Sequence, residues 1–587
     1  MNKKLSHILH KVQDVLLRYP MVLVMAAIMA VTIVYNVETE NKSAGNFTLV
    51  KIIITSALGI SLMFAVKMLS QRIGKELLWQ ALGILFLIGF YFILPDEKEL
   101  FTEVYAFVII PTFVLSHLMV AFIPFLNHTP EKNFWQYNKN LFVNFVLTAI
   151  FTGVLTGGVL LAILSVDQLF AMDIEERYYG ETFCMLAIIG STFIFLLFDE
   201  SGVEFLEKDG DYPQVLKFFT QFILIPLLII YSIILYLYSA KILVNWELPK
   251  GWVSYLILAY SIIGILALLL VHPLKEQSSK SWVKMFSRIF YFTLIPLIVL
   301  LFTAIFTRLL QYGFTEARYF VLLLAVWLLV VVLYFIFIKK STIKFIPVSL
   351  FLFGLFALVF PYFNAFSVAK RSQKFEFEKV LTENSLLKNG KIDFDKKITY
   401  AVAYDISNKF EFLNKRVEED YLQGFLNAEA AKSLKNNDKY NIGHLADLFK
   451  NVESGQNEFV EKTLRLYSKQ SYYTINDYQY AVSKNLMYRQ TKIHNDYFWL
   501  RETFGENPIL ELSLNSNEKV DLLPLIDKLF EKHTILNGEI EANNISLEID
   551  LGKYHIKLFF KDIVKTTSPE GKHRYIIDDA LFLIREK

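Results

Sequence analysis

The chain has 587 residues, of which 54% are hydrophobic, with a mean hydropathy of +0.39 and a formal net charge of +2. This composition is more apolar than that of an average soluble domain, and a near-neutral chain without a basic stripe argues against nucleic acid as a partner. The one cysteine, Cys184, lies in an apolar run, and no Cys-x-x-Cys or His-rich cluster occurs. The sequence therefore predicts no disulfide, no metal site and no cofactor.

Residues 1–19 are predicted to form an amphipathic helix in the cytoplasmic interface of a membrane. Apolar residues recur at helical spacing from Leu5 to Tyr19, and basic residues occupy the other faces. One interpretation is a helix that senses lipids or docks a partner. The simpler interpretation is a topology anchor, which basic residues before a first span favour.

Eleven apolar segments then come one after another with short polar breaks. A helix crosses the hydrocarbon core with roughly 20 apolar residues, and these segments approach or exceed that length. The expected spans are residues 20–36, 48–68, 77–95, 104–126, 141–165, 181–198, 215–240, 252–271, 289–307, 319–338 and 344–363. The chain is therefore expected to be a polytopic α-helical membrane bundle over residues 20–369, with a soluble domain over 370–587.

The loop charges predict the orientation. Lys and Arg are more numerous in the loops on the side of the N-terminus, which places that side in the cytoplasm. An odd number of spans then puts the C-terminal domain outside the cell membrane. A single miscounted span would reverse that side, and Lys370 and Arg371 after the last span argue mildly for the reverse.

Few ionisable residues fall inside the predicted spans. His117 is the one near the middle of a span, and it is interpreted either as a proton or ligand site or as a neutral histidine bonded to a neighbouring helix. Asp and Glu occur at span ends, which argues against a carrier coupled to protons through a buried carboxylate. Gly153 and Gly157 form a small-residue face that predicts close helix packing.

A polar segment, Tyr312-Gly-Phe-Thr-Glu-Ala-Arg318, precedes the tenth predicted span. Thr315 is expected to cap the next helix, and Glu316 then lies in its positively polarised first turn. Arg318 is too close in sequence to face Glu316 across a helical turn, so we expect it to pair with another acidic group or with the C-terminal domain. The segment is either a well-capped turn or a polar cluster facing a substrate.

Residues 312–319, Tyr-Gly-Phe-Thr-Glu-Ala-Arg-Tyr, resemble a signature of a bacterial membrane family, the domain-of-unknown-function family 4153. The stretch after the last span, with Leu-Leu-Lys-Asn-Gly-Lys at 386–391, is similar to the stretch after the membrane region in that family. The resemblance implies a polytopic bacterial membrane protein of unknown function. It implies no catalytic residues.

The soluble domain is predicted to be α+β. Helices are expected over residues 374–388, 396–414, 417–435, 440–453 and 522–533. Strands are expected over 472–487, 509–514 and 575–584, with a hairpin that pairs 545–551 with 554–560 across a two-residue turn. No nucleophile elbow, phosphate loop or dinucleotide fingerprint occurs in the sequence.

Three functions remain open from the sequence. The first is a non-enzymatic envelope protein that anchors, senses or binds a partner, with the bilayer and an envelope protein or lipid-linked ligand as partners. The second is a lipid-linked glycosyl or phospho-group transferase, for which Glu38 and Glu40 in the first external loop are the acidic candidates. The third is a transporter of an uncharged substrate. Convergence of these glutamates with Glu316 and Arg318 would favour the transferase.

Overall fold

The computed structural model describes the chain except for a set of short segments and single residues: 1–2, 41–46, 127–129, 200–201, 209–211, 246–251, 276–280, 417, 432–443, 454–461, 469–471, 476, 489, 504–508, 516, 532–537, 543, 568–572 and 578. It divides into a membrane unit, Met1–Lys379 with Lys409–Leu422, and a soluble unit, Val380–Asn408 with Gln423–Lys587.

This division differs from the domain boundary expected at Lys370. That position lies inside the helix α16 (Ala365–Glu383), which begins in the membrane unit and ends in the soluble unit. The helix α17 (Tyr400–Asn414) begins in the soluble unit and ends in the membrane unit. Neither helix contains Gly or Pro, so nothing in the sequence stops α16 where the apolar run ends.

The membrane unit begins with α1 (Lys3–Arg18), which is helical as predicted. Its last turn buries Val15, whereas Leu16 and Leu17 remain exposed. Such an apolar, unpacked surface suits a helix lying in a membrane interface.

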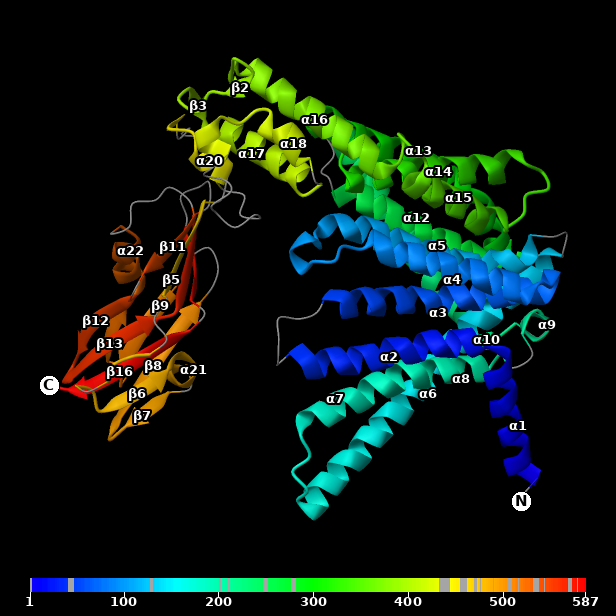
Figure 1. Cartoon of the computed structure of the whole chain (residues 1–587), viewed down its shortest axis with the longest axis horizontal. Helices are drawn as coiled ribbons and strands as arrows, with labels where there is room; N and C mark the ends of the chain where they lie inside the picture. The colour runs from blue at the N-terminus through cyan, green and yellow to red at the C-terminus, as the bar shows by residue number, and fades with distance from the viewer. Residues whose placement is uncertain are drawn as a thin grey trace. The chain divides into compact units, whose positions relative to one another are not determined.

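Ten apolar segments of the described chain are long enough to cross a membrane, which confirms a multi-pass membrane protein. The helices that form them are α2 (Pro20–Glu40), α3 (Phe47–Ile73), α4 (Glu76–Ile93), α5 (Ala106–Phe122), α6 (Glu131–Phe170), α7 (Glu176–Met185) with α8 (Ser191–Leu197), α10 (Gln214–Phe218) with α11 (Ile225–Asn245), α12 (Trp252–Val271), α13 (Ser281–Tyr312) and α14 (Glu316–Phe337). The helices α2, α3 and α4 run side by side (Figure 1).

An eleventh apolar helix, α15 (Phe345–Val359), occupies the last predicted span but is shorter than the other ten. It ends just before Phe360-Pro361, where the proline restricts the residue before it to extended conformations. The short helices of this unit are η1 (Lys98–Leu100), η2 (Glu103–Tyr105), η3 (Ile123–Phe125), α9 (Val203–Leu206), η6 (His272–Lys275) and α18 (Glu419–Gln423, which ends in the soluble unit).

Two of the described spans contain a π-helical turn. One turn, η4 (Leu186–Gly190), joins α7 to α8, and the other, η5 (Phe219–Leu224), joins α10 to α11. Single π-turns inside α-helices are rare and occur frequently at functional sites.

The soluble unit is rich in strands, as an α+β domain requires. The strands are β1 (Leu387–Lys388), β2 (Lys391–Ile392), β3 (Lys397–Thr399), β4 (Asn451–Glu453), β5 (Lys462–Ser468), β6 (Tyr480–Ser483), β7 (Thr491–Ile493), β8 (Asp496–Thr503), β9 (Ile509–Leu514), β10 (Glu518–Asp521), β11 (Gly538–Ala542), β12 (Ser546–Leu551), β13 (Tyr554–Phe560), β14 (Asp562–Thr567), β15 (His573–Ile577) and β16 (Ala580–Glu586). Three four-stranded sheets have the orders β10-β9-β8-β7, β11-β5-β14-β15 and β12-β13-β16-β6.

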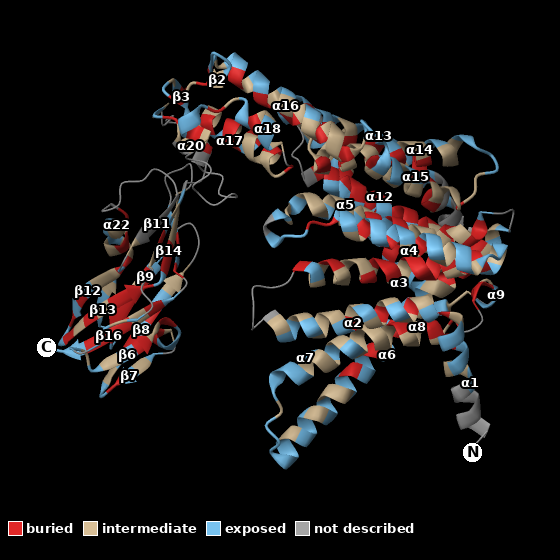
Figure 2. Cartoon of the chain, in the orientation of Figure 1, coloured by how far each residue is buried: buried red, intermediate tan, exposed pale blue. Residues whose placement is uncertain are grey.

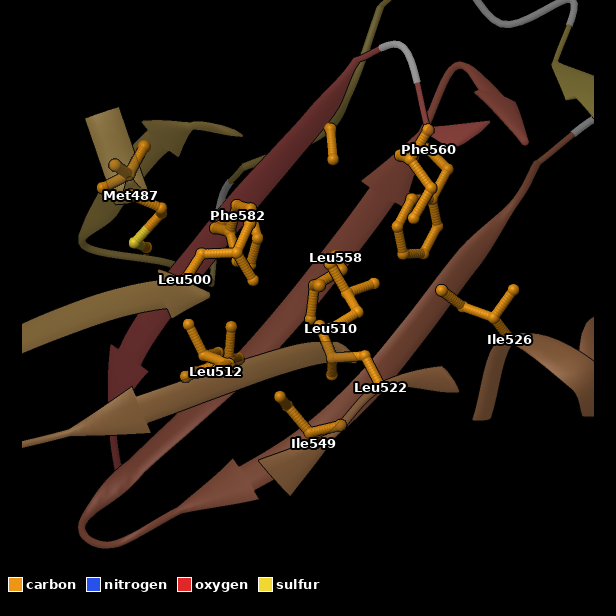
Figure 3. Close-up of a cluster of buried hydrophobic side chains, with 14 of the residues drawn as sticks. Met487, Leu500, Leu510, Leu512, Leu522, Ile526, Ile549, Leu558, Phe560 and Phe582 are labelled. Atoms are coloured by element: carbon orange, nitrogen blue, oxygen red, sulfur yellow. The ribbon is translucent and has the colours of Figure 1, made fainter. Parts of the chain in front are cut away.

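The predicted hairpin is confirmed as β12 and β13. Leu551 pairs with Tyr554, so Gly552 and Lys553 form the two-residue turn, and Gly552 has the positive φ of 57° that such a turn requires. Around this hairpin the sheets share one apolar core, in which Leu510, Leu512, Leu558 and Phe582 meet (Figure 3). The helix α22 (Leu523–Glu531), expected over 522–533, adds Ile526 to that core.

Other predictions for this unit were wrong in detail. The strand expected over 472–487 is only β6, with the short helix α21 (Lys484–Met487) after it. The strand expected over 575–584 is two strands, β15 and β16, which belong to different sheets. The helices expected over 417–435 and 440–453 are represented by α18 and the one-turn α20 (His444–Asp447), with residues 432–443 outside the described part. At the end of the second segment, residues 451–453 form β4, which pairs in parallel with β3 instead of continuing a helix.

Candidate functional site: a cavity inside the membrane unit

A cavity of about 720 Å³ lies among the N-terminal spans of the membrane unit. Its walls come from α2, α3, α5, α6 and the span formed by α7, η4 and α8. The lining residues are mostly apolar, with a few hydroxyl groups and one imidazole: Val22, Ile60, Ser61, Phe64, His117, Val120, Phe145, Thr148, Ala149, Thr152, Gly153, Thr156, Gly157, Leu160, Phe183, Ala187, Ser191, Thr192, Phe195 and Leu196. This volume is within the range of small-molecule sites, about 300–1,000 Å³.

The most distinctive wall is a row of three threonines on α6. Thr148, Thr152 and Thr156 succeed one another at the four-residue spacing that places side chains on one helical face. All three side chains are buried, and among the described residues none of the three hydroxyl groups has a hydrogen-bond partner. By contrast, Thr112 on α5 donates to the carbonyl of Val108 at 2.7 Å, the usual bond for a helical threonine.

Unsatisfied buried hydroxyl groups are costly, so three in a row require an explanation. A rise of 1.5 Å per residue makes the row roughly 12 Å long. A ligand that lies along α6 and offers hydrogen-bonding atoms would satisfy all three hydroxyl groups.

His117 on α5 contributes the one ionisable side chain of the lining. Its Nδ1 lies 2.8 Å from the carbonyl oxygen of Phe113, which only accepts, so Nδ1 carries the proton. The same bond leaves Nε2 of the neutral ring as an acceptor. Next to it, the hydroxyl groups of Ser61 and Ser116 lie 2.7 Å apart and join α3 to α5. The imidazole is thus bonded within its own helix, and it lines the cavity.

Gly153 and Gly157, predicted to allow close helix packing, instead line the cavity. A side chain placed at either position would meet no atom within 4 Å, so no neighbouring helix approaches there. Figure 2 shows that this part of α6 is largely exposed or half-buried, with isolated buried positions. The small side chains therefore widen the cavity, whose lining also includes Ala187 of the π-turn η4.

The Tyr312–Arg318 turn forms a different kind of polar cluster. Thr315 caps α14, as predicted, by accepting from the main-chain N of Arg318 at 3.5 Å. Both carboxylate oxygens of Glu316 accept from Arg416, at 2.7 Å from Nε and 2.6 Å from Nη2. Both side chains are buried, and the guanidinium group also lies over the ring of Phe412 at 3.3 Å. This geometry is a bidentate, fully desolvated ion pair.

Among the described residues Arg318 pairs with no acidic group and bonds instead to main-chain carbonyl groups, which differs from the expected pairing with an acidic group or with the C-terminal domain. Its Nη1 donates to the carbonyl oxygens of Tyr312 and Gly313, at 3.1 and 2.8 Å. The carbonyl of Tyr312 also accepts from Gln373 of α16, at 2.9 Å. Carbonyl groups at the end of α13 lack partners within their own helix, so they attract the nearest cation.

The segment around Lys370 is bound to the chain between α17 and α18 through Glu418. Lys370 and Lys374 lie 2.9 and 2.6 Å from its carboxylate oxygens. Burial alone would raise the pKa of Glu418, but the hydrogen bonds from Lys374 and Lys370 outweigh burial and hold the pKa below its usual range. This ion-pair cluster and the Glu316–Arg416 pair fasten residues 409–422 to the membrane helices.

Of the two acidic candidates in the first external loop, the described one, Glu38, lies apart from this cluster. Glu38 is exposed near the end of α2, and the side chain of Glu40 lies outside the described residues. The helices α2 and α14 belong to separate layers of the membrane unit, with α3, α4 and α5 between them (Figure 1). The Glu38, Glu316 and Arg318 positions are therefore not gathered into one site.

Lys51 is a further charge within a predicted span. It is buried in α3, where its Nζ lies 2.5 Å from Asp96 and 4.3 Å from the centre of the Tyr91 ring. Asp96 neutralises it, so it adds no free charge to the membrane interior. Within the described part of the chain, no group of three His, Cys, Asp or Glu side chains is placed to hold a metal ion.

The sequence pointed to His117 but not to the three threonines. Their signal was present as hydroxyl groups at positions 148, 152 and 156 in an otherwise apolar helix. Helical threonines usually bond to their own backbone, so the spacing by itself did not predict hydroxyl groups without partners. The sequence did not predict the pairing of Arg416, because its partner Glu316 lies a hundred residues away along the chain.

Fold and site together define a multi-pass membrane protein with an intramembrane cavity and a strand-rich soluble unit. The chain belongs to the family described as domain of unknown function DUF4153, whose model matches residues 21–389. It is similar to an uncharacterised protein of Pasteurella multocida (strain Pm70), with 28% identity over 280 residues, and it spans about half of that relative, since the match covers 46% of each. No solved structure gives a significant match.

Proposed function

We propose that this protein is a non-enzymatic envelope protein whose membrane unit binds an uncharged membrane amphiphile in the cavity. The observation that carries the proposal is the row of three buried hydroxyl groups without partners, at Thr148, Thr152 and Thr156. The lining residues that the structure describes include no Lys, Arg, Asp or Glu, so none of them compensates a charged head group. A lipid whose head carries hydroxyl groups matches both features.

Transfer chemistry has less support. The carboxylate of Glu316 is held by two charge-assisted hydrogen bonds from Arg416, which leaves it unavailable as a general acid or base. Glu38 lies away from it, on α2. The transporter alternative is favoured by one observation, the π-turn η4 in the cavity wall, because a π-turn is a place where a helix can change register.

The test is photo-crosslinking of two lipids with the same photoreactive acyl chain. The purified protein is placed in nanodiscs with photoreactive monoglucosyl-diacylglycerol, which is uncharged, or with photoreactive phosphatidylglycerol, which is anionic. We expect the glucolipid to label α6 peptides more strongly. The triple substitution Thr148→Val, Thr152→Val and Thr156→Val should abolish that preference, since each hydroxyl group supplies one hydrogen bond of about 0.5–1.5 kcal/mol.

A matched control replaces two threonines of α13. Thr303→Val and Thr307→Val remove hydroxyl groups that already donate to their own helix, at 3.0 and 2.8 Å. This variant should keep the preference for the glucolipid. Equal labelling by the two lipids, or an unchanged preference in the triple variant, would refute the proposal. Movement of the glucolipid between leaflets of proteoliposomes would favour the transporter.

We also propose that the protein sits in the cell membrane with its N-terminus in the cytoplasm and its soluble unit outside. The distribution of Lys and Arg among the loops supports a cytoplasmic N-terminus. The soluble unit then lies outside only if the shorter helix α15 crosses the membrane as an eleventh span. An alkaline phosphatase fused after Lys370 should be active. An inactive fusion with an active cytoplasmic reporter at the same position would reverse the orientation.

A further inference from the structure

Tyr19 and Asp199 meet at one end of the cavity. Tyr19 stands between α1 and α2, one helical turn before the lining residue Val22, and Asp199 comes just after α8, one turn beyond the lining residue Leu196. The Tyr19 hydroxyl donates to the main-chain oxygen of Asp199 at 2.9 Å and approaches Oδ2 at 3.3 Å. The contact therefore lies just behind the lining residues at that end of the cavity.

The ring of Tyr19 packs against the wall of the cavity. It stacks on Phe64, with ring centres 6.0 Å apart, and Phe64 packs edge-on against Phe195, with ring centres 5.5 Å apart. Both phenylalanines line the cavity. The ring of Tyr19 thus connects these lining residues to the Asp199 contact.

The carboxyl group of Asp199 is in an unusual setting. It is completely buried (0% exposed), and Oδ1 has no hydrogen-bond partner in the described part of the chain. Ion-pair partners lie within 4 Å of many carboxylates in this structure, but none is found for Asp199 among the described residues. Burial raises the pKa of Asp199 well above its usual value, and the Tyr19 hydrogen bond and the charge of Arg18 offset this only in part.

Among the described groups around Asp199, Arg18 is the nearby cation, and its charge offsets the effect of burial only in part. Tyr19 and Arg18 face Asp199 from the α1 side, and Tyr137 faces it from α6. Burial raises the pKa of Tyr19 as well, so its hydroxyl stays protonated. From α3, the carboxamide of Gln71 accepts from the main-chain N of Val203 at 2.9 Å, and Arg72 is bonded to Glu207. The charge of Arg72 is thus already balanced.

We propose that Asp199 is a proton-binding site that controls access to the cavity from the α1 end. With the proton bound, the carboxyl is neutral and stays dry, while the Tyr19 hydroxyl donates to the main-chain oxygen of Asp199. Because the pKa of the folded, closed state is raised, closure is fully favoured at low pH and is lost as the pH rises through that pKa. The ionised carboxylate then requires water, which opens the end of the cavity. This inference rests on the cavity being the binding site proposed above.

The test measures access and needs no ligand. In a Cys184→Ser background, Ser61→Cys places a thiol on the cavity wall, and His10→Cys places a reference thiol on an exposed position of α1. Each protein in nanodiscs is treated with a membrane-impermeant maleimide between about pH 6 and pH 8, around the ordinary titration range of such thiols. The labelling rate of the Ser61→Cys thiol is divided by that of the His10→Cys thiol, and this ratio corrects for thiol ionisation.

We expect this ratio to rise with pH, by up to about tenfold per pH unit, the limit for one titrating group. Asp199→Asn keeps the shape of the carboxyl but cannot ionise, so its ratio should stay low at every pH. Tyr19→Phe keeps the ring on Phe64 but lacks the hydroxyl, so its ratio should be high even at the lowest pH. The same pH profile in both variants and the parent, or a flat profile in the parent, would overturn the proposal. Since Tyr19→Phe alone tests the contact, misfolding of Asp199→Asn leaves a decisive variant.

A negative glucolipid crosslinking result with a positive result here would leave the proton-controlled access intact and remove only the proposed ligand. A positive crosslinking result with a negative result here would refute the proton-binding site and leave the proposed ligand supported. The two proposals are therefore separable.

Discussion

Two polar regions of the membrane unit contrast sharply. In the Tyr312–Arg318 turn, the carboxylate of Glu316, the guanidinium of Arg318 and the cap of α14 are all hydrogen-bonded within the protein. Along α6, three buried threonine hydroxyl groups have no partner. Polar groups that are satisfied within the protein stabilise the fold, whereas buried polar groups without partners cost stability and require an explanation, for which we propose a bound ligand.

The largest effect should come from breaking the ion pair at the turn. Arg416→Ala leaves the Glu316 carboxylate buried without a counter-charge, which should lower the free energy of unfolding by about 3–5 kcal/mol. The measurement is unfolding of the purified protein in mixed micelles. The control is the double variant Glu316→Leu with Arg416→Met, which removes both charges and should lie close to the parent. A double variant as unstable as the single one would show that the charges themselves are not the cause.

Arg318→Ala should lower the free energy of unfolding by a smaller amount. This change removes the charged donor to the Tyr312 and Gly313 carbonyls and should cost about 1.5–3 kcal/mol. Because Gln373 of α16 binds the same Tyr312 carbonyl, cleavage by trypsin at Lys370–Arg371 should also accelerate. Arg308→Ala is the matched control, since Arg308 lies over the Tyr312 ring at 5.9 Å. Equal cleavage rates for the two variants would show that the hydrogen bonds of Arg318 do not stabilise this contact with α16.

The smallest effect should have the opposite sign. In the absence of ligand, Thr152→Val replaces an unsatisfied buried hydroxyl with a methyl group of the same shape, and it should raise stability by about 1 kcal/mol. Thr112→Val serves as the comparison, because it removes a hydroxyl that donates to Val108 and should not stabilise. If both substitutions change stability in the same direction by the same amount, the contrast between the two regions is lost.

The two units also differ in how well their sequences predict their structures. In the membrane unit, ten spans were located from apolar length alone, because a bilayer requires long helices that satisfy their own backbone. In the soluble unit, β12 and β13 were located by alternation and a Gly-Lys turn, while β5 and β8 were missed. Pairing along β5 joins β11 in parallel and β14 antiparallel, and that pairing depends on residues far apart in the chain.

The sequence by itself determined the class of protein, the helix cap at Thr315, the hairpin turn at Gly552 and the presence of a histidine within a span, because each depends on residues within one or two turns of one another. Only the tertiary structure decided which polar groups find partners. Arg416 neutralises Glu316 across a hundred residues, and Asp199 meets Tyr19 across 180, while the α6 hydroxyl groups meet none. Burial and hydrogen bonding are properties of the packed surroundings, so a carboxylate at the end of a span looks the same in sequence whether it is solvated, paired or enclosed.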